Sequence, residues 1–96
     1  MTARRITIAE IRQACAAHFG VTVADILGPS RKQVHFLPRA VAIFLALKIT
    51  DKTASTLGKT YFGGRDHATI GHAYKRVLSD YDLIAEAAVI LDGLLV

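Results

Sequence analysis

The residues with the most chemical potential lie in one short stretch, Gly63 to Thr69, where a glycine pair precedes a run of polar side chains. Asp66, His67 and Thr69 carry a carboxylate, an imidazole and a hydroxyl group, all of which can exchange hydrogen bonds with the edges of nucleic-acid bases. Asp66 is also placed to begin a helix, because its carboxylate can accept the free amide of Ala68 or Thr69. Asp66 is therefore predicted to cap a helix, to contact a base, or to do both.

The chain offers no set of residues for catalysis or metal binding. His67 and His72 are five residues apart, out of phase for the i, i+4 pairing of helical zinc sites, and the lone Cys15 adds no ligand set. Gly58-Lys59-Thr60 imitates the end of a phosphate-binding loop, but Thr53 stands where that loop needs a glycine. We expect no enzyme activity, no metal and no cofactor, and we expect His72 to pack or hydrogen-bond within the fold.

Charge is distributed unevenly along the chain. The 96 residues have a net charge of +4, but the segment from Arg31 to Arg76 contains nine Lys or Arg residues against Asp51 and Asp66 only, which makes it +7. Residues 77–96 contain four acids and no base, which makes them −4. A basic block of this kind is typical of a protein that binds a polyanion such as nucleic acid, although it can also be a solvated face.

Length and hydropathy patterning predict one all-α domain over residues 1–96. Apolar residues recur at helical spacings, and the apolar segment 41–47 suits a buried central helix that Pro38 begins or kinks. The predicted helices span residues 8–19, 23–27, 38–49, 53–61, 66–78 and 82–94. No run approaches the roughly 18 to 20 apolar residues of a membrane-spanning helix, and a single cysteine fits the reducing cytoplasm. The expected fold is a compact bundle of five to six short helices.

Two of these helices form a helix-turn-helix candidate of the Trp repressor-like type. The helices over 53–61 and 66–78 are separated by the turn at Gly63-Gly64. In this motif the N-terminal residues of the second helix meet base edges in the major groove of DNA. The motif region is therefore residues 53–78, followed by a C-terminal helix within 79–96.

The string Gly63-Gly64-Arg65-Asp66-His67-Ala68-Thr69-Ile70, followed by His72-Ala73, closely resembles the GGRDHTTV...HA signature of the DNA-binding domain of the bacterial replication initiator DnaA. The resemblance extends from about Ile6 to Val77. It implies a DnaA C-terminal type of fold, and a protein that binds a short asymmetric A·T-rich box in double-stranded DNA as a monomer.

The resemblance also implies roles for individual residues. Asp66, His67 and Thr69 match positions that face bases in the major groove, where the Ala68 methyl could touch a thymine methyl. Arg31 matches an arginine inserted in the adjoining minor groove, where a narrow A·T tract strengthens the negative potential. The basic residues expected at the phosphates are Lys32, Arg39, Lys48, Lys52, Arg65, Lys75 and Arg76.

This sequence departs from the family pattern in two places that bear on base preference. Ala68 replaces the usual threonine of the signature and so lacks its hydroxyl group. Between Gly58 and the glycine pair this chain has one additional residue, so that by count Tyr61 takes the usual phenylalanine position and Phe62 is extra. We expect the insertion to rotate the second helix of the motif and the alanine to relax or shift specificity.

The C-terminal helix leaves two functions open. Its apolar residues, among them Leu91 and Leu95, exceed what one narrow buried stripe needs, so it either closes the core or contacts a partner or second copy. One hypothesis is a cytoplasmic, nucleoid-associated DNA-binding protein that modulates replication initiation or transcription. The alternative is an interaction module for the initiator or another replication protein. Because Met1 precedes the domain by only a few residues, we expect a stand-alone relative or an excised domain, without an ATPase module.

Overall fold

The computed structural model describes residues 5–96, and the predicted domain start at Met1 lies outside the described residues. The described residues form helices and connecting loops, which confirms the all-α expectation. The helices are α1 (Ile8–Phe19), α2 (Val23–Leu27), α3 (Gln33–Ile49), α4 (Ala54–Thr56), the π-helical segment η1 (Leu57–Tyr61), α5 (His67–Leu78) and α6 (Tyr81–Leu95).

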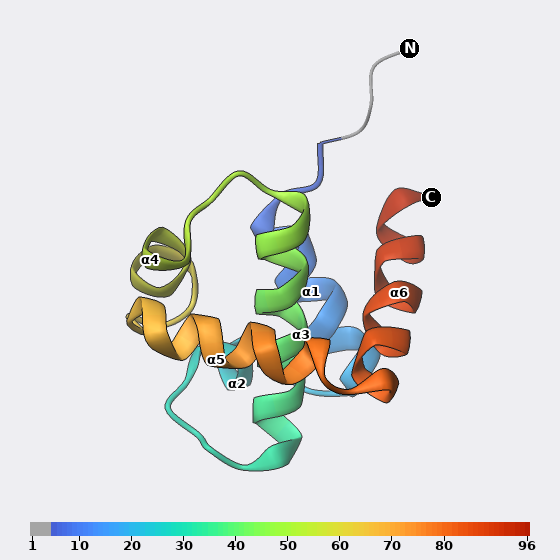
Figure 1. The fold of residues 1–96 in the computed structure, drawn as a ribbon. Helices are drawn as coiled ribbons and strands as arrows, with labels where there is room; N and C mark the ends of the chain where they lie inside the picture. Colours follow the sequence, from blue (N-terminus) through green and yellow to red (C-terminus); the bar gives the residue numbers. More distant parts are fainter. Residues whose placement is uncertain (1–4) are drawn as a thin grey trace.

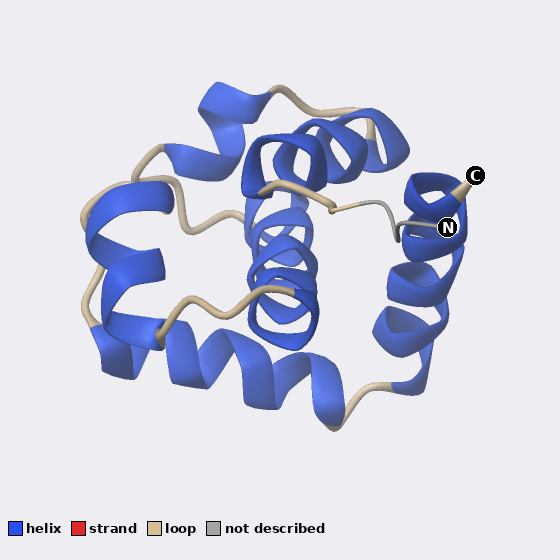
Figure 2. Ribbon diagram, turned by 90° about the horizontal axis from the view of Figure 1, so that it is seen from above, coloured by secondary structure: helices blue, strands red, loops and turns tan. Residues whose placement is uncertain are grey.

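Helix α3 is the centre of the fold. In both views it lies between α4 on one side and α6 on the other, while α5 crosses it (Figures 1 and 2). Residues 38–46 of α3 are all buried, as the uninterrupted apolar segment predicted. The fully buried side chains of Ile11, Ile26, Ile70 and Val77 bring the three helices α1, α2 and α5 into one core with α3. Helices α1, α2, α5 and α6 are thus positioned by their contact with α3, whereas α4 packs on α5 and η1.

Local sequence signals set the ends of the first two helices. Thr7 and Thr22 each accept a hydrogen bond from the backbone three residues later, from Glu10 and Asp25, whose carboxylates accept in return. Gly20 ends α1 with a φ of 71°, in the left-handed region that favours glycine. These caps and ends agree with the predicted bounds of both helices.

The predicted start of the central helix at Pro38 is wrong. Helix α3 begins at Gln33, and Pro38 lies inside it, one full turn beyond the start. A proline lacks only its own amide, so a helix can continue through it when the lost bond is limited to one carbonyl and the ring is packed. Pro38 is buried, and Phe36 N–H bonds Lys32 O at 2.8 Å to close the first turn. The basic loop that precedes α3 is consequently only residues 28–32.

Helix α6 closes one side of the core with a single stripe. Leu83, Ala87, Ile90 and Leu94 are buried, whereas Val89 is exposed, so the structure shows the core-closing role directly. Asp80 caps the helix by accepting from the amides of residues 82 and 83, so α6 begins at Tyr81, one residue earlier than expected. Within residues 5–96, none of the helices has both the length and the apolar character that crossing a bilayer would require.

Candidate nucleic-acid interface

The N-terminal end of α5, residues 66–69, is an exposed helix start that we call the reading tip. All four of its residues are exposed, and Thr69 N–H donates to Asp66 Oδ1 at 2.9 Å. This hydrogen bond confirms the predicted cap and lowers the pKa of the Asp66 carboxyl, because the bond favours its charged form. The reading tip is therefore fixed by its own cap, with the polar groups of His67 and Thr69 open to a ligand.

The outer face of α5 continues beyond the tip. Ile70, Ala73 and Val77 are buried on the inner side, and the residues that share the opposite face with Ala68 are His72 and Lys75. His72 is exposed, so the expectation that it packs or bonds within the fold is wrong. Its spacing of four residues from Ala68 was the signal that could have placed it on this face.

The additional residue before the glycine pair is absorbed by the π-helical segment. Helix α4 gives way at Leu57 to η1, whose wider turn holds one residue more than an α-helical turn. Phe62 is completely buried in the core, whereas Tyr61 is only half-buried. The position assigned to Tyr61 by count therefore belongs to Phe62. Phe62 is not the surplus residue, and the extra length is taken up within 57–61.

The turn of the motif brings two backbone segments into direct contact. Arg65 N–H donates to Gly58 O at 2.8 Å, and a Cβ on Gly58 would lie 2.0 Å from Arg65 O. Gly63 and Gly64 both have positive φ values, 73° and 76°, which side chains rarely adopt. Glycine is thus required at Gly58 for close approach and at the pair for conformation, which together fix how α5 leaves the turn.

The α2–α3 loop, residues 28–32, lies on the same side of the molecule as the N-terminal end of α5 (Figure 1), and Arg31 is part of this loop. Its side chain is exposed. An open cavity of about 640 Å³ is lined by residues of this loop, including Arg31, and by Thr69 of the tip. The structure therefore brings Arg31, predicted for the minor groove, to the same cavity as Thr69, one of the residues predicted for the major groove.

Arg39 occupies a different position from the one predicted. Its side chain is only 5% exposed, and its guanidinium donates to backbone carbonyls of the α2–α3 region instead of facing solvent. The acceptors are the carbonyls of Asp25, Ile26, Gly28 and Ser30. Burial, and then the neighbouring charge of Arg65, lower the pKa of Arg39. The predicted phosphate contact of Arg39 is wrong, because its donors are already used inside the protein.

Arg65 is engaged in a similar way but is less buried. Its Nη1 donates to Leu27 O at 3.2 Å and to Phe62 O at 2.9 Å, and its Nη2 donates to Gly28 O. Burial lowers the pKa of Arg65 as well. Arg65 therefore links the turn of the motif to the loop that carries Arg31, and most of its donors are directed inward rather than to a phosphate.

The other predicted phosphate contacts remain on the surface. Lys32, Lys52 and Lys75 are exposed. Lys48 Nζ lies 5.9 Å from the centre of the Phe44 ring, and this ring stacks on Tyr74 of α5, so the exposed lysine lies beside α5.

Arg76 differs from these lysines. It is half-buried, and its Nη2 lies 3.7 Å from Asp80 Oδ2, one helical turn further along the chain. Part of its charge is therefore already opposed within the protein.

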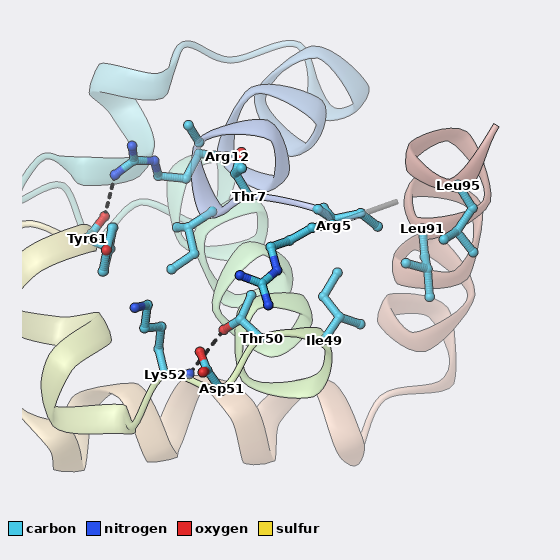
Figure 3. Close-up of a pocket in the computed structure, with 13 residues that line it drawn as sticks. Arg5, Thr7, Arg12, Ile49, Thr50, Asp51, Lys52, Tyr61, Leu91 and Leu95 are labelled. Atoms are coloured by element: carbon cyan, nitrogen blue, oxygen red, sulfur yellow. Dashed lines mark hydrogen bonds between the residues drawn. The ribbon is translucent and has the colours of Figure 1, made fainter. Parts of the chain in front are cut away.

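A second cavity, of about 990 Å³, lies at the opposite end of α3, between α1, the segment 49–52 and α6 (Figure 3). Arg12 is directed from α1 toward η1 there, and its Nη1 donates to Tyr61 O at 2.8 Å. Of the residues predicted to contact DNA, only Lys52 lines this cavity. The cavity is therefore separate from the reading tip, and its main link to the motif is the Arg12 hydrogen bond that holds the end of η1.

A compact helical domain with a capped, exposed second helix after a tight glycine turn defines a helix-turn-helix protein. A model described as the bacterial dnaA protein helix-turn-helix matches residues 8–77, so the chain belongs to this family. This is the DNA-binding class of domain, not a catalytic one. The match ends at residue 77, so α6 lies beyond it.

Curated relatives agree with the family match. The chain is 38% identical over 74 residues to the chromosomal replication initiator protein DnaA of Roseobacter denitrificans, covering 77% of this chain and 16% of the relative. The same protein of Caulobacter vibrioides is 40% identical over 74 residues, with 77% and 15% covered. That of Latilactobacillus sakei is 38% identical over 73 residues, with 76% and 16% covered. The chain thus spans about one sixth of the length of these relatives.

Proposed function

We propose that this chain binds double-stranded DNA in a sequence-specific manner, at A·T-rich sites like the boxes of the initiator DnaA. The observation that carries the proposal is the reading tip: an exposed, capped helix start with the family signature Asp66 to Thr69, within a block of net charge +7. The resemblance assigns base contacts to Asp66, His67 and Thr69. Their exposure on one helix end supports that assignment.

The geometry supports a two-groove mode of binding. With the reading tip in the major groove, the α2–α3 loop on the same side of the molecule is within reach of the adjoining minor groove, where Arg31 would enter. Such an arrangement reads an asymmetric site with one copy of the chain. We therefore propose a monomer on DNA.

Ala68 and the exposed lysines complete the proposed interface. The Ala68 methyl would contact a thymine methyl. The absence of the usual threonine hydroxyl would then shift the base preference at this position, but the contact with the thymine methyl would remain. Lys32, Lys48, Lys52 and Lys75 would neutralise phosphates, since each is exposed. His72 joins them as a candidate contact, because it lies between Ala68 and Lys75 on the outer face of α5.

The biological role proposed from this interface is competition for, or assistance at, sites that a full-length initiator occupies. The relatives are chromosomal replication initiator proteins, and this chain corresponds to about one sixth of their length. We propose that it acts at the nucleoid in the cytoplasm, modulating replication initiation or transcription by binding alone.

The test compares a duplex carrying an initiator box with a scrambled duplex of the same composition, by fluorescence anisotropy at two salt concentrations. The wild type is expected to prefer the box, and His67→Ala or Thr69→Ala is expected to lose about 1 to 3 kcal/mol of that preference per contact. Val89→Ser, on the exposed face of α6, is the matched control and should bind as the wild type does. Equal affinity of the wild type for both duplexes would reject specific readout.

A second function is favoured by the exposed apolar residues of α6. Val89 and Leu95 are each 59% exposed on a helix that the family match does not cover. They would suit a contact with the initiator, another replication protein or a second copy. Purified initiator DnaA captured by the wild type but not by a folded Leu95→Asp variant would support this function, and unaltered capture would count against α6 as the contact.

A further inference from the structure

The carbonyl groups of the α2–α3 region converge on two guanidinium groups from different parts of the chain. Arg39 of α3 donates through Nε to Ile26 O at 2.6 Å, through Nη1 to Ser30 O at 3.0 Å, and through Nη2 to Asp25 O at 3.1 Å. Gly28 O is shared, because it accepts from Nη2 of Arg39 at 3.0 Å and also from Nη2 of Arg65. The two arginines therefore hold one loop between them, an arrangement that we call the arginine clamp.

The residues held by the clamp are adjacent in sequence to Arg31 of the α2–α3 loop and to the reading tip. On one side it holds Ser30 O, and Ser30 immediately precedes Arg31. On the other side Arg65 itself immediately precedes Asp66, the cap of the reading tip. A shift of either element would have to break hydrogen bonds to the other, because Arg65 Nη1 bonds both Leu27 O and Phe62 O.

Two further contacts restrict movement of the α2–α3 loop relative to the turn before α5. A Cβ on Gly63 would lie 2.3 Å from Leu27 O and 2.6 Å from Nη1 of Arg65, so the turn is packed against the end of α2. His35 Nδ1 is 2.8 Å from Ser30 Oγ, which ties the same loop to the first turn of α3.

The chemistry of the clamp favours a positioning role over a phosphate contact. Among the described ion pairs, none involves Arg39 or Arg65, and carbonyl oxygens take the place of acids. Burial lowers the pKa of both groups, in keeping with guanidiniums withdrawn from solvent. The planar guanidinium can hold several carbonyls in fixed directions, which an ammonium group cannot do.

We propose that the arginine clamp fixes the separation between Arg31 and the reading tip, and thereby sets the number of base pairs between the minor-groove and major-groove contacts of a bound site. This inference rests on the proposed function, since it requires both elements to engage one duplex. Arg39 and Arg65 act as positioning residues in it. They determine the register of readout without touching the bases.

The experiment uses the labelled duplex of highest affinity that the wild type selects from a random pool, together with versions that have one base pair inserted or deleted between the A·T-rich minor-groove segment and the major-groove segment. The wild type is expected to lose about tenfold or more in affinity with either change, as for a mismatched contact. Arg39→Lys and Arg65→Lys keep the charge but not the geometry. They are expected to bind the best duplex more weakly and to differ by less than about threefold across the spacing series.

The salt dependence separates positioning from a phosphate contact. A positioning role predicts an unchanged slope of log affinity against log salt for the lysine variants, with the loss confined to the selected duplex. An equal loss of affinity for the selected and the scrambled duplexes would overturn the positioning role. Full retention of the spacing preference in both variants would overturn it as well. A wild type that tolerates every spacing would also overturn it, whereas a wild type that selects no sequence would reject the proposed function instead.

Folding is controlled by circular dichroism at the assay temperature and by a matched variant. Arg12→Lys removes another arginine that donates to a backbone carbonyl, that of Tyr61, at a site away from the α2–α3 loop. It is expected to keep the spacing preference even where it lowers the melting temperature. If Arg39→Lys does not fold, the less buried Arg65→Lys decides the question, because it removes the bonds to Leu27 O and Gly28 O on its own.

Discussion

Helices α5 and α6 pack on the core in the same way but have chemically different outer faces. Each buries one apolar stripe in the core around α3, with Ile70, Ala73 and Val77 in α5 and the stripe from Leu83 to Leu94 in α6. The outer face of α5 is polar and cationic, whereas that of α6 combines acids with exposed apolar side chains. Packing therefore explains the inner faces of both helices, and function must be sought in the outer faces.

The two helices also differ in how strictly the backbone around them is constrained. The turn before α5 needs Gly58 because a Cβ there would lie 2.0 Å from Arg65 O, but Gly93 in α6 has no atom within 4 Å of such a Cβ. The family match covers α5 to its next-to-last residue and omits α6. The part of the chain whose backbone is most constrained, the turn before α5, thus lies within the family match.

The largest effect is expected from Gly58→Ala. The methyl group would collide with backbone rather than with a movable side chain, so the turn must open and lose the Arg65 to Gly58 hydrogen bond. Overpacking of this severity should lower the free energy of unfolding by about 3 kcal/mol or more. Chemical denaturation measures the loss, and DNA affinity should fall with it because the reading tip is displaced. A stable variant with wild-type binding would show that α5 is not positioned by this contact.

A smaller effect is expected at Asp66, where two substitutions separate capping from base contact. Asp66→Ala should lower the melting temperature by a few degrees, while Asp66→Asn should retain most of the cap because asparagine is an equally good N-cap. If the carboxylate also accepts from a cytosine amine, Asp66→Asn should still change the preferred base at one position of the site. Selection from a random pool with each variant measures this, and identical selected sites would leave Asp66 with the capping role alone.

The pH dependence of the cap has a defined sign. The hydrogen bond from Thr69 holds the pKa of Asp66 below its ordinary value, so the folded state favours the carboxylate. Its contribution to stability is present above the unfolded pKa of about 4 and is lost as the pH falls through the folded value. The difference in melting temperature between the wild type and Asp66→Ala should therefore shrink below about pH 4. A constant difference down to pH 2 would contradict an ionic cap.

Much of this fold could be predicted from the sequence because its signals are local. The cap at Thr7, the left-handed glycine at Gly20 and the cap at Asp66 depend on residues within one helical turn. The apolar segment 41–47 likewise predicted a buried central helix. In each case the deciding contacts lie close together along the chain.

The parts that could not be predicted depend on contacts between distant residues. The sequence predicts Arg39 to be a surface cation, because it belongs to a basic block. In the fold its side chain is buried, because the backbone carbonyls of the α2–α3 region accept its hydrogen bonds. Counting from Gly58 assigns the usual phenylalanine position of the family to Tyr61, because a count assumes α-helical turns and η1 is wider, whereas Phe62 is the residue buried in the core. The start of α3 was misplaced since tertiary burial of Pro38 compensates for its missing amide.

On the outer face of α5, Lys75→Gln and Arg76→Gln should differ although the residues are adjacent. Lys75 is exposed, with no described ion pair, whereas Arg76 is half-buried and lies 3.7 Å from Asp80. A phosphate contact by Lys75 predicts that its loss flattens the slope of log affinity against log salt by about 0.9. Arg76→Gln should flatten it less, since part of that charge is already opposed. Equal slopes for both variants and the wild type would place the phosphate contacts elsewhere.

The smallest effect, and one of opposite sign, is expected from Gly93→Ala in α6. The position is exposed and helical with open space around it, so the added methyl meets nothing and the unfolded chain loses freedom. The free energy of unfolding should rise by about 0.5 to 1 kcal/mol, or less if the end of α6 frays. DNA affinity should not change, because α6 packs on the side of α3 opposite to the α2–α3 loop and the reading tip (Figure 1). Denaturation and anisotropy on the same preparation test both statements, and a loss of DNA affinity would contradict the division between α5 and α6.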